Sequence, residues 1–360
     1  MKKILIFLVI SIFALSALFF GISCKTQTTE TTAAKETTTI AEATTTTEAA
    51  TTETTEAEFD SSQYTIYIET PLKAHPVLRQ MVMGSLLAAR DLGYKYKWLA
   101  TEGADIVADV AMLEQCVAEI KASGGKGAII TSPYGGSAFD EVVKAAVKDG
   151  IPVIAVHHPV TAAFTTGIGP NPKEEVQLAG KAIAEAVNGK GQIAITQGAL
   201  WSELESLLTL NYQLYFKANY KDIELLPAEE EGYDPAIAIE KATAIMQKYP
   251  KLVAGISTTG GGPSTWAGAQ DATGRKLVAV GMDTTEVNLD LLTSDKVFGL
   301  IYQGITEEFY DAVKLADKAL RGMEVGPIYY SKVDFVTKDK ADYYREEAKK
   351  VDATLKEFGY

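Results

Sequence analysis

Residues 63–360 alternate short apolar runs with longer amphipathic stretches. The short runs predict strands buried on both faces of a sheet, where apolar residues follow one another without polar breaks. The longer stretches repeat apolar residues at helical spacing, as Val77 and Met81 do. The predicted strands are 64–69, 94–99, 127–131, 152–156, 163–168, 192–197, 222–226, 252–257, 277–282 and 297–302. The predicted helices are 76–92, 106–121, 137–148, 173–187, 235–248 and 306–321.

Prolines and glycines support these helix boundaries. Pro76, Pro172 and Pro235 lie near a first helical turn, where the missing N–H of proline costs nothing. Gly93 and Gly150 lie just past helix ends, where a left-handed residue is often needed. Strands alternating with helices predict an α/β fold with parallel sheets covered by helices on both faces. About ten strands suit two doubly wound domains better than one.

The N-terminus differs from the rest of the chain. Lys2 and Lys3 precede an apolar run over residues 4–20, and small residues stand before Cys24. This pattern predicts a secretory signal over residues 1–23 and a location outside the cytoplasm, in the cell envelope or periplasm. It resembles a bacterial lipoprotein signal, which implies that Cys24 is lipidated and anchors the chain to the membrane. An uncleaved N-terminal anchor is the alternative.

Residues 24–62 form the second region, in which a low-complexity segment follows Cys24. Between residues 26 and 58 the chain holds 16 Thr, 7 Glu and 7 Ala, with Gln27, Lys35 and Ile40 as the other three residues. A segment with one large aliphatic residue cannot bury enough apolar area to offset its ordering entropy. We therefore expect a disordered tether between the membrane and the folded part.

Composition excludes several classes of function. The formal net charge is −13, whereas a nucleic-acid-binding protein needs a basic face. The two cysteines, Cys24 and Cys116, cannot form a disulfide scaffold. Three histidines and the absence of HExxH or paired CxxC motifs predict neither a metal centre nor another cofactor. A zinc site that uses His75 and a neighbouring histidine is the weaker alternative, because further ligands are not evident.

Parallel doubly wound sheets bind ligands at the carboxyl ends of their strands, so the loops there carry the function. These loops are rich in aromatic and hydrogen-bonding side chains but hold no nucleophile with a matching base, no GxSxG motif and no phosphate loop. We therefore expect a binding protein rather than an enzyme. Aromatic rings with a few directed polar groups suit a small neutral hydroxylated ligand.

Almost all of residues 63–360 resembles the type I periplasmic solute-binding proteins of the sugar-binding (ribose-binding-protein-like) family, which serve ABC importers. The resemblance rests on the order and spacing of several segments. Residues 75–78 lead into a helix that ends at 92–94, and residues 127–133 precede 149–154. Residues 189–191 precede a strand, and residues 280–283 end another strand. It implies two similar α/β lobes, 63–168 plus 304–330 and 169–303 plus 331–360, joined by three hinge crossovers. It also implies a monomer that closes on a sugar and delivers it to an ABC transporter permease.

The family's site carries over only in part. His75-Pro76-Val77-Leu78 stands where the family has Asn-Pro and two aromatics, and His157-His158 stands in place of Asp-Arg. Because adjacent residues in extended chain point opposite ways, we expect one of these two histidines to face the cleft and the other to pack or be solvated. The family's arginine near Glu205 and its asparagine in the 259–261 loop are also absent. Tyr233, Asp283 and Gln303 match the family pattern. The residues expected to bind the ligand are His75, Tyr134, His157, Trp201, Tyr233, Thr259, Asp283 and Gln303.

Alternatives remain open at this point. A ligand-sensing receptor of the same fold, feeding a chemoreceptor or kinase, is the main one, and an extracytoplasmic enzyme is the weakest. A furanose-type signal, a nucleoside or a polyol could replace the sugar. Trp266 could face the cleft or pack in a helix, and the 260–262 glycines favour a close-approach turn over a phosphate cradle.

Overall fold

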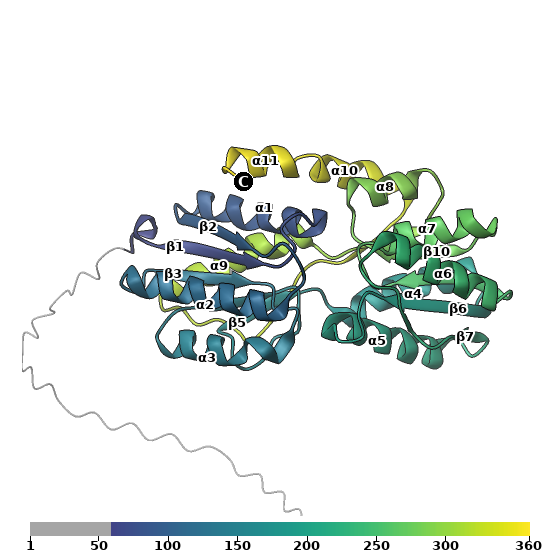
Figure 1. The fold of residues 1–360 in the computed structure, drawn as a ribbon, viewed down its shortest axis with the longest axis horizontal. Helices are drawn as coiled ribbons and strands as arrows, with labels where there is room; N and C mark the ends of the chain where they lie inside the picture. The colour runs from purple at the N-terminus through teal and green to yellow at the C-terminus, as the bar shows by residue number, and fades with distance from the viewer. Residues whose placement is uncertain (1–58) are drawn as a thin grey trace, which may run out of the picture. The chain divides into compact units, whose positions relative to one another are not determined.

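The computed structural model describes residues 59–360, which lie within one compact unit (Figure 1). Cys24 and residues 1–58, with the predicted signal and most of the predicted tether, lie outside the described residues. Two sheets organise the described part of the chain. The predicted α/β class with two doubly wound lobes is confirmed.

The first sheet has the strand order β12-β5-β4-β3-β1-β2, and all its pairs are parallel. Its strands are buried runs such as Gly127–Thr131, as predicted for a sheet covered on both faces. The strands are β1 (Thr65–Thr70), β2 (Lys95–Ala100), β3 (Gly127–Thr131), β4 (Val153–Val156), β5 (Thr166–Gly169) and β12 (Tyr329–Tyr330). The helices of this lobe are α1 (Pro76–Asp91), α2 (Ile106–Ala122), α3 (Asp140–Lys148) and α9 (Ile305–Leu320).

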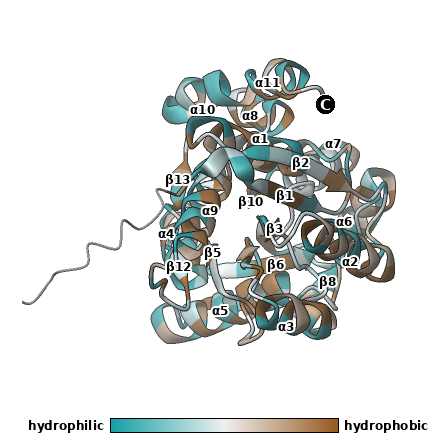
Figure 2. Cartoon of the chain, turned by 90° about the vertical axis from the view of Figure 1, so that its left-hand side faces the viewer, coloured by the Kyte–Doolittle hydropathy of each residue, from teal (hydrophilic) through white to brown (hydrophobic). Residues whose placement is uncertain are grey.

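Successive side chains of these strands enter different cores. Ile66, Ile68 and Ile130 share a core with α1 and α9, whereas Tyr67 and Ile129 share one with α2 and α3. This division follows from the two-residue period of a strand. Figure 2 shows the strands lying between helices whose ribbons carry both hydrophilic and hydrophobic residues.

The second sheet has the order β13-β11-β10-β9-β6-β7, with β8 beside β6, and only β13 pairs antiparallel. Its strands are β6 (Gly191–Gln197), β7 (Ile223–Leu225), β8 (Glu229–Glu230), β9 (Leu252–Ser257), β10 (Val278–Met282), β11 (Gly299–Tyr302) and β13 (Asp334–Val336). Its helices are α4 (Pro172–Ala186), α5 (Glu203–Asn219), α6 (Pro235–Lys248), α7 (Gly262–Thr273) and α8 (Glu286–Thr293).

The chain passes between the lobes three times in the described residues. It leaves the first sheet after β5 and returns from β11 to α9, which packs on β3, β4 and β5. It crosses once more between β12 and β13. These crossings agree with the expected hinge.

The last two helices, α10 (Ala341–Ala348) and α11 (Val351–Glu357), run along both lobes (Figure 1). Helix α10 packs on α8, and α11 packs on α1 of the first lobe. Arg345 pairs with Asp290 at 2.6 Å, and Arg79 pairs with Asp352 at 2.9 Å. The predicted lobe boundaries stay a prediction, but α11 lies on the first lobe although the sequence placed 331–360 with the second.

Local signals explain the well-predicted helix starts. Pro76, Pro172 and Pro235 each occupy a first helical turn. Asp234 caps α6 by accepting from the N–H groups of Ala236 and Ile237. Gly93 and Gly150 have positive φ values, as expected past helix ends.

Candidate functional site

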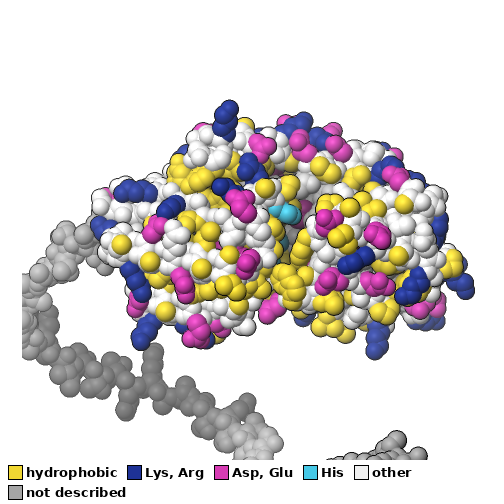
Figure 3. Space-filling model, viewed as in Figure 1, with side chains coloured by type: hydrophobic (Ala, Val, Ile, Leu, Met, Phe, Trp, Pro, Cys, Tyr) yellow, Lys and Arg dark blue, Asp and Glu magenta, His cyan; other side chains and the backbone are white. Residues whose placement is uncertain are grey.

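A cavity of about 360 Å³ lies between the two lobes, where strands of both sheets end. Its volume is at the lower end of the range for small-molecule sites. Figure 3 shows the groove between the lobes, with a histidine inside and apolar side chains along its edges. Loops after β1, β3, β4, β6, β8, β9, β10 and β11 contribute to its lining.

All eight residues predicted to bind ligand line this one cavity: His75, Tyr134, His157, Trp201, Tyr233, Thr259, Asp283 and Gln303. Because the carboxyl ends of parallel strands meet at one edge, the topology gathers loops that are far apart in the sequence. The ligand-binding role of each residue stays a prediction.

The first lobe contributes an apolar wall and several polar groups. Leu72, Val77 and Met81 line the cavity together with His75 and Tyr134. His75 precedes α1, and burial lowers its pKa, so the imidazole is neutral near pH 7. Its Nδ1 is buried and has no hydrogen-bond partner among the described residues.

Tyr134 presents its ring rather than its hydroxyl. The hydroxyl donates to Asp109 Oδ2 at 2.5 Å, and the Thr101 hydroxyl donates to Asp109 Oδ1 at 2.6 Å. The Tyr134 ring centroid lies 5.7 Å from that of Trp201 on the second lobe. Tyr134 therefore offers an aromatic surface held in place by Asp109, and its ring touches the opposite lobe.

His157 and His158 both line the cavity, which corrects an expectation. Adjacent residues in extended chain point opposite ways, so only one was expected to face the cleft. His157 instead has φ +69°, in the left-handed region, so the alternation does not hold. Burial and the neighbouring His157 lower the pKa of His158 to about 3, which keeps that ring neutral.

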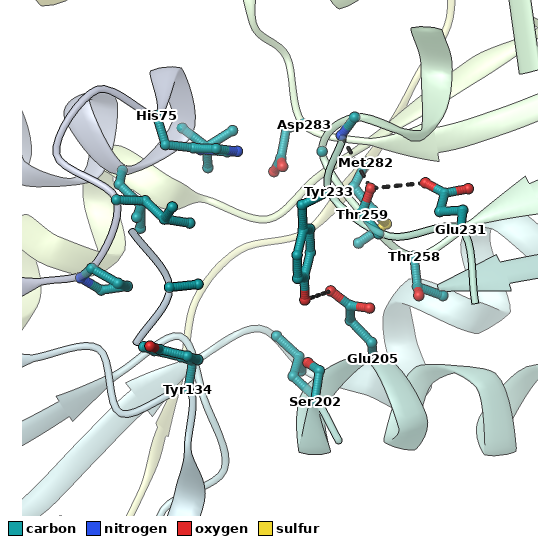
Figure 4. A pocket seen from close by; sticks show the side chains of 18 of the residues that line it. His75, Tyr134, Ser202, Glu205, Glu231, Tyr233, Thr258, Thr259, Met282 and Asp283 are labelled. Atoms are coloured by element: carbon teal, nitrogen blue, oxygen red, sulfur yellow. Dashed lines mark hydrogen bonds between the residues drawn. The ribbon is translucent and has the colours of Figure 1, made fainter. Parts of the chain in front are cut away.

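Glu205, near the start of α5, fixes the aromatic side of the second lobe. Its Oε2 accepts from the N–H groups of Gly198 at 2.5 Å and Ala199 at 3.2 Å. Its Oε1 accepts from the Tyr233 hydroxyl at 3.1 Å (Figure 4). Burial raises the pKa of Glu205 to about 7. The carboxylate therefore fixes Tyr233, whose ring continues the aromatic surface at 6.4 Å from Trp201.

Glu231 plays a similar part for Thr259. Its Oε1 accepts from the hydroxyls of Ser257 at 3.0 Å and Thr259 at 3.1 Å. Burial raises the pKa of Glu231, and these hydroxyls offset part of the shift. Thr259 lies between this carboxyl and the cavity (Figure 4).

Asp283 follows β10 and points into the cavity (Figure 4). It has φ +67°, a conformation that aspartate adopts more readily than most residues. Its side chain is buried, and its Oδ1 has no hydrogen-bond partner among the described residues. A buried acceptor without a donor is costly, so this carboxylate can accept a hydrogen bond from a molecule in the cavity.

Gln303 is held at the hinge by a carboxyl that the sequence did not point to. Its Nε2 donates to Glu175 Oε1 at 2.7 Å, and both residues are buried. His157 Nδ1 lies 3.4 Å from Glu308 Oε2 beside them. Burial lowers the pKa of His157, but Glu308, Asp283 and Glu175 together outweigh this effect and leave it raised. The hinge therefore carries three carboxyls around one imidazole.

The carboxyls of Glu205, Glu231, Glu175 and Glu308 were missed from the sequence. Glu231 ends a run of three glutamates, which reads as a solvated surface segment. Glu175 and Glu308 lie in the first turns of α4 and α9, where glutamates favour the helix dipole without any further role. A signal existed only for Glu205, which lies near the position expected for the family's arginine.

Two open alternatives are settled by packing. Trp266 is completely buried in α7 against Gly255 and does not line the cavity. A Cβ on Gly260 would stand 2.5 Å from Asp283 Oδ2, as a close-approach turn requires.

Within residues 59–360 no group of three or more histidine, cysteine or acidic side chains could hold a metal ion. No helix in this part of the chain is long and apolar enough to cross a membrane.

Comparisons with known proteins agree with this architecture. A family model described as a periplasmic binding protein domain matches residues 66–324. The chain belongs to this family. The family consists of solute-binding proteins rather than enzymes and implies a location outside the cytoplasm. A search of the curated proteins found no match.

Solved structures share the two-lobed fold of this periplasmic binding protein. The glucose-galactose binding protein GanP from Geobacillus stearothermophilus is 23% identical with a TM-score of 0.71, over 77% of this chain and 98% of its own. A solute-binding protein from Burkholderia graminis in complex with D-arabinose is 21% identical with a TM-score of 0.73, over 80% and 99%. One from Bacillus halodurans with bound myo-inositol is 18% identical with a TM-score of 0.70, over 80% and 99%. At this identity the likeness shows the fold alone.

Proposed function

We propose that this protein is an extracytoplasmic receptor that captures a small hydroxylated solute, a sugar, and delivers it to the permease of an ABC importer. The observation that carries the proposal is the Asp283 carboxylate, which points without a partner into a cavity walled by the rings of Tyr134, Trp201 and Tyr233. Ring faces stack on the C–H faces of a sugar, while carboxylates accept from its hydroxyls. The sugar complexes among proteins of the same fold support this assignment.

Binding is coupled to closure of the lobes in this proposal. Tyr134 of the first lobe and Trp201 of the second come together at the cavity, so a ligand between them contacts both lobes. Only contacts that differ between open and closed states shift the balance between them. The closed form is the one that docks on the permease, and the receptor works as a monomer.

We also propose that a lipid on Cys24 holds the receptor at the membrane through the 24–62 tether. Two acyl chains suffice for stable anchoring, whereas a single chain does not. Mass spectrometry of the membrane fraction should find a diacylglycerol-modified cysteine as the new N-terminus. An unmodified Cys24 in that fraction would contradict the anchor and leave the binding function untouched.

The binding function is tested by a thermal-shift screen against sugars, polyols and nucleosides, followed by calorimetry on the best binder. Bound ligand raises the stability by RT ln(1 + [L]/Kd), so weak binders are detected at millimolar concentration. Asp283→Ala should weaken binding by roughly 1.5–3 kcal/mol, because a charge-assisted hydrogen bond is lost. Unchanged affinity in this variant would show that the ligand binds elsewhere.

A further inference from the structure

The cavity lining contains acidic side chains but no lysine or arginine among the described residues. The four acidic residues are Glu205, Glu231, Asp234 and Asp283. The bases in the lining are the three histidines, of which His75 and His158 have lowered pKa values and are neutral near pH 7. The remaining base, His157, lies at the hinge beside Glu308.

Three of these four carboxylates already have donors in the protein. Glu205 accepts from two backbone N–H groups and from Tyr233. Asp234 caps α6, and Glu231 accepts from Ser257 and Thr259. The buried Oδ1 of Asp283 accepts no hydrogen bond from any described residue, and only 5% of the residue is exposed. Its charge is therefore available to a ligand.

The groups around Asp283 do not cancel this charge. Its charged neighbours are His157 and Glu308, and Glu175 lies beside the same imidazole. Burial raises the pKa of Glu175 to about 8, so this carboxyl is protonated at neutral pH. His157 pairs with Glu308, whose Oε2 lies 3.4 Å from its Nδ1. Burial raises the pKa of Asp283 to about 6, so this carboxyl is mostly ionised at pH 7.5, and its buried Oδ1 has no partner among the described residues.

The aromatic surface favours the same kind of ligand. The rings of Tyr134, Trp201 and Tyr233 follow one another at 5.7 Å and 6.4 Å between centroids along the cavity. The faces of such rings attract cations, most strongly where water is excluded. A neutral sugar would form hydrogen bonds to Asp283 but would leave its buried charge unbalanced, which is costly.

We propose that the ligand is an amine-bearing sugar or polyol whose ammonium group pairs with Asp283 while its hydroxyls face the threonine-rich loop after β9. This inference rests on the proposed function and replaces the expected neutral ligand by a cationic one. The apolar wall of Leu72, Val77 and Met81 faces the C–H side of the same molecule.

The test measures the affinity of the full chain by calorimetry for matched pairs at pH 7.5: glucosamine with glucose, and galactosamine with galactose. The N-acetylated forms, which carry no charge, and choline, an ammonium without a sugar ring, complete the panel. We expect at least one amino sugar to bind ten-fold or more tightly than its neutral and acetylated counterparts. In Asp283→Asn, which keeps an acceptor oxygen and tolerates a positive φ, this preference should disappear while neutral sugars still bind.

The control variant is Asp105→Asn, which also removes one negative charge but lies outside the cavity lining. Asp105 caps α2, and asparagine caps as well as aspartate does. The preference for the amine should persist in this control. If it disappears there too, a general field effect explains the preference and the inference falls.

The remaining outcomes separate the inference from the function on which it rests. Neutral sugars that bind as tightly as their amines would overturn the inference and leave the proposed function standing. Binding of choline without any sugar or amino sugar would overturn both, because no hydroxylated ring would then be recognised. No binding by any member of the panel would overturn the inference, and the wider screen of sugars, polyols and nucleosides then decides the proposed function.

Discussion

Gly260 sets how closely the loop after β9 approaches Asp283. A Cβ at this position would lie 2.5 Å from Asp283 Oδ2 and 3.3 Å from Val77 Cγ2. Gly260→Ala should therefore push the carboxylate out of place and lower ligand affinity ten-fold or more, as measured by calorimetry. The melting temperature should change little, because the φ of Gly260 is not in the left-handed region and the Asp283 carboxylate can move into the cavity.

Gly261→Ala is the matched control for this substitution. Its Cβ would meet only Thr259 Oγ1, at 3.6 Å, which is an ordinary contact. Affinity should stay within about two-fold of the unsubstituted chain. Equal losses in the two variants would mean that flexibility of the glycine loop, rather than the position of Asp283, controls binding.

At the residue scale, the sequence pointed to side chains that line one cavity but not to the hydrogen bonds that hold them. Asp283 and Gln303 follow apolar runs, and parallel topology brings such positions together. The partners of Gln303 and Thr259 are glutamates that lie on other elements, and no local pattern links them. The positive φ of His157 likewise depends on tertiary contacts, so both histidines line the cavity against expectation.

At the scale of elements, helices α1 and α9 of the first lobe cross with their backbones in close contact. A Cβ on Gly84 would lie 2.1 Å from the carbonyl oxygen of Thr306, so the two helix backbones approach closely there. Gly84→Ala should lower the free energy of unfolding by about 1–3 kcal/mol, because backbone must move to make room. This loss should exceed the gain of up to about 1 kcal/mol in helix propensity. Chemical denaturation measures the change.

Gly103→Ala serves as the control, since a Cβ there meets no atom within 4 Å. It should leave the free energy of unfolding within about 0.5 kcal/mol of the unsubstituted chain. A stable Gly84→Ala variant would show that α1 and α9 can move apart without cost, contrary to the close crossing described above.

The bounds of helix α6 follow from local signals, whereas no local signal assigns α11 to a lobe. Pro235 and Asp234 mark the start of α6, and its bounds match the prediction. Helix α11, residues 351–357, is amphipathic and buries one face. Such a pattern does not say against which lobe the helix packs. The ring contacts of Tyr96 with Phe358 and of Trp98 with Tyr360 bind the C-terminal end to the first lobe.

At the scale of the whole molecule, the strap of α10 and α11 limits how the lobes can separate. Its ion pairs reach Asp290 on the second lobe and Arg79 on the first. Three crossings lie on the hinge side, and the strap joins the lobes independently of them. Opening of the lobes can therefore take one of two forms. Either the hinge bends while α10 and α11 stay attached to both lobes, or α11 loses its contacts with the first lobe.

The hinge also links stability to pH through Glu175. This carboxyl is completely buried, and burial raises its pKa from an ordinary 4.5 to about 8. Between these values the folded chain holds a proton that the unfolded chain has released. The free energy of unfolding therefore falls as pH rises from about 4.5 to 8, by up to about 1.4 kcal/mol per pH unit. The raised pKa of His157 acts in the same direction above its ordinary 6.5.

Glu175→Gln removes this ionisation and keeps an acceptor oxygen for the Gln303 amide, so the hydrogen bond at the hinge survives. Denaturant unfolding between pH 5 and 8 should show a flatter dependence in the variant and a higher stability than the unsubstituted chain at pH 8. Glu174→Gln, its exposed neighbour on α4, should keep the original slope. If Glu175→Gln keeps that slope as well, another buried carboxyl such as Glu69, whose pKa burial also raises to about 8, holds the proton.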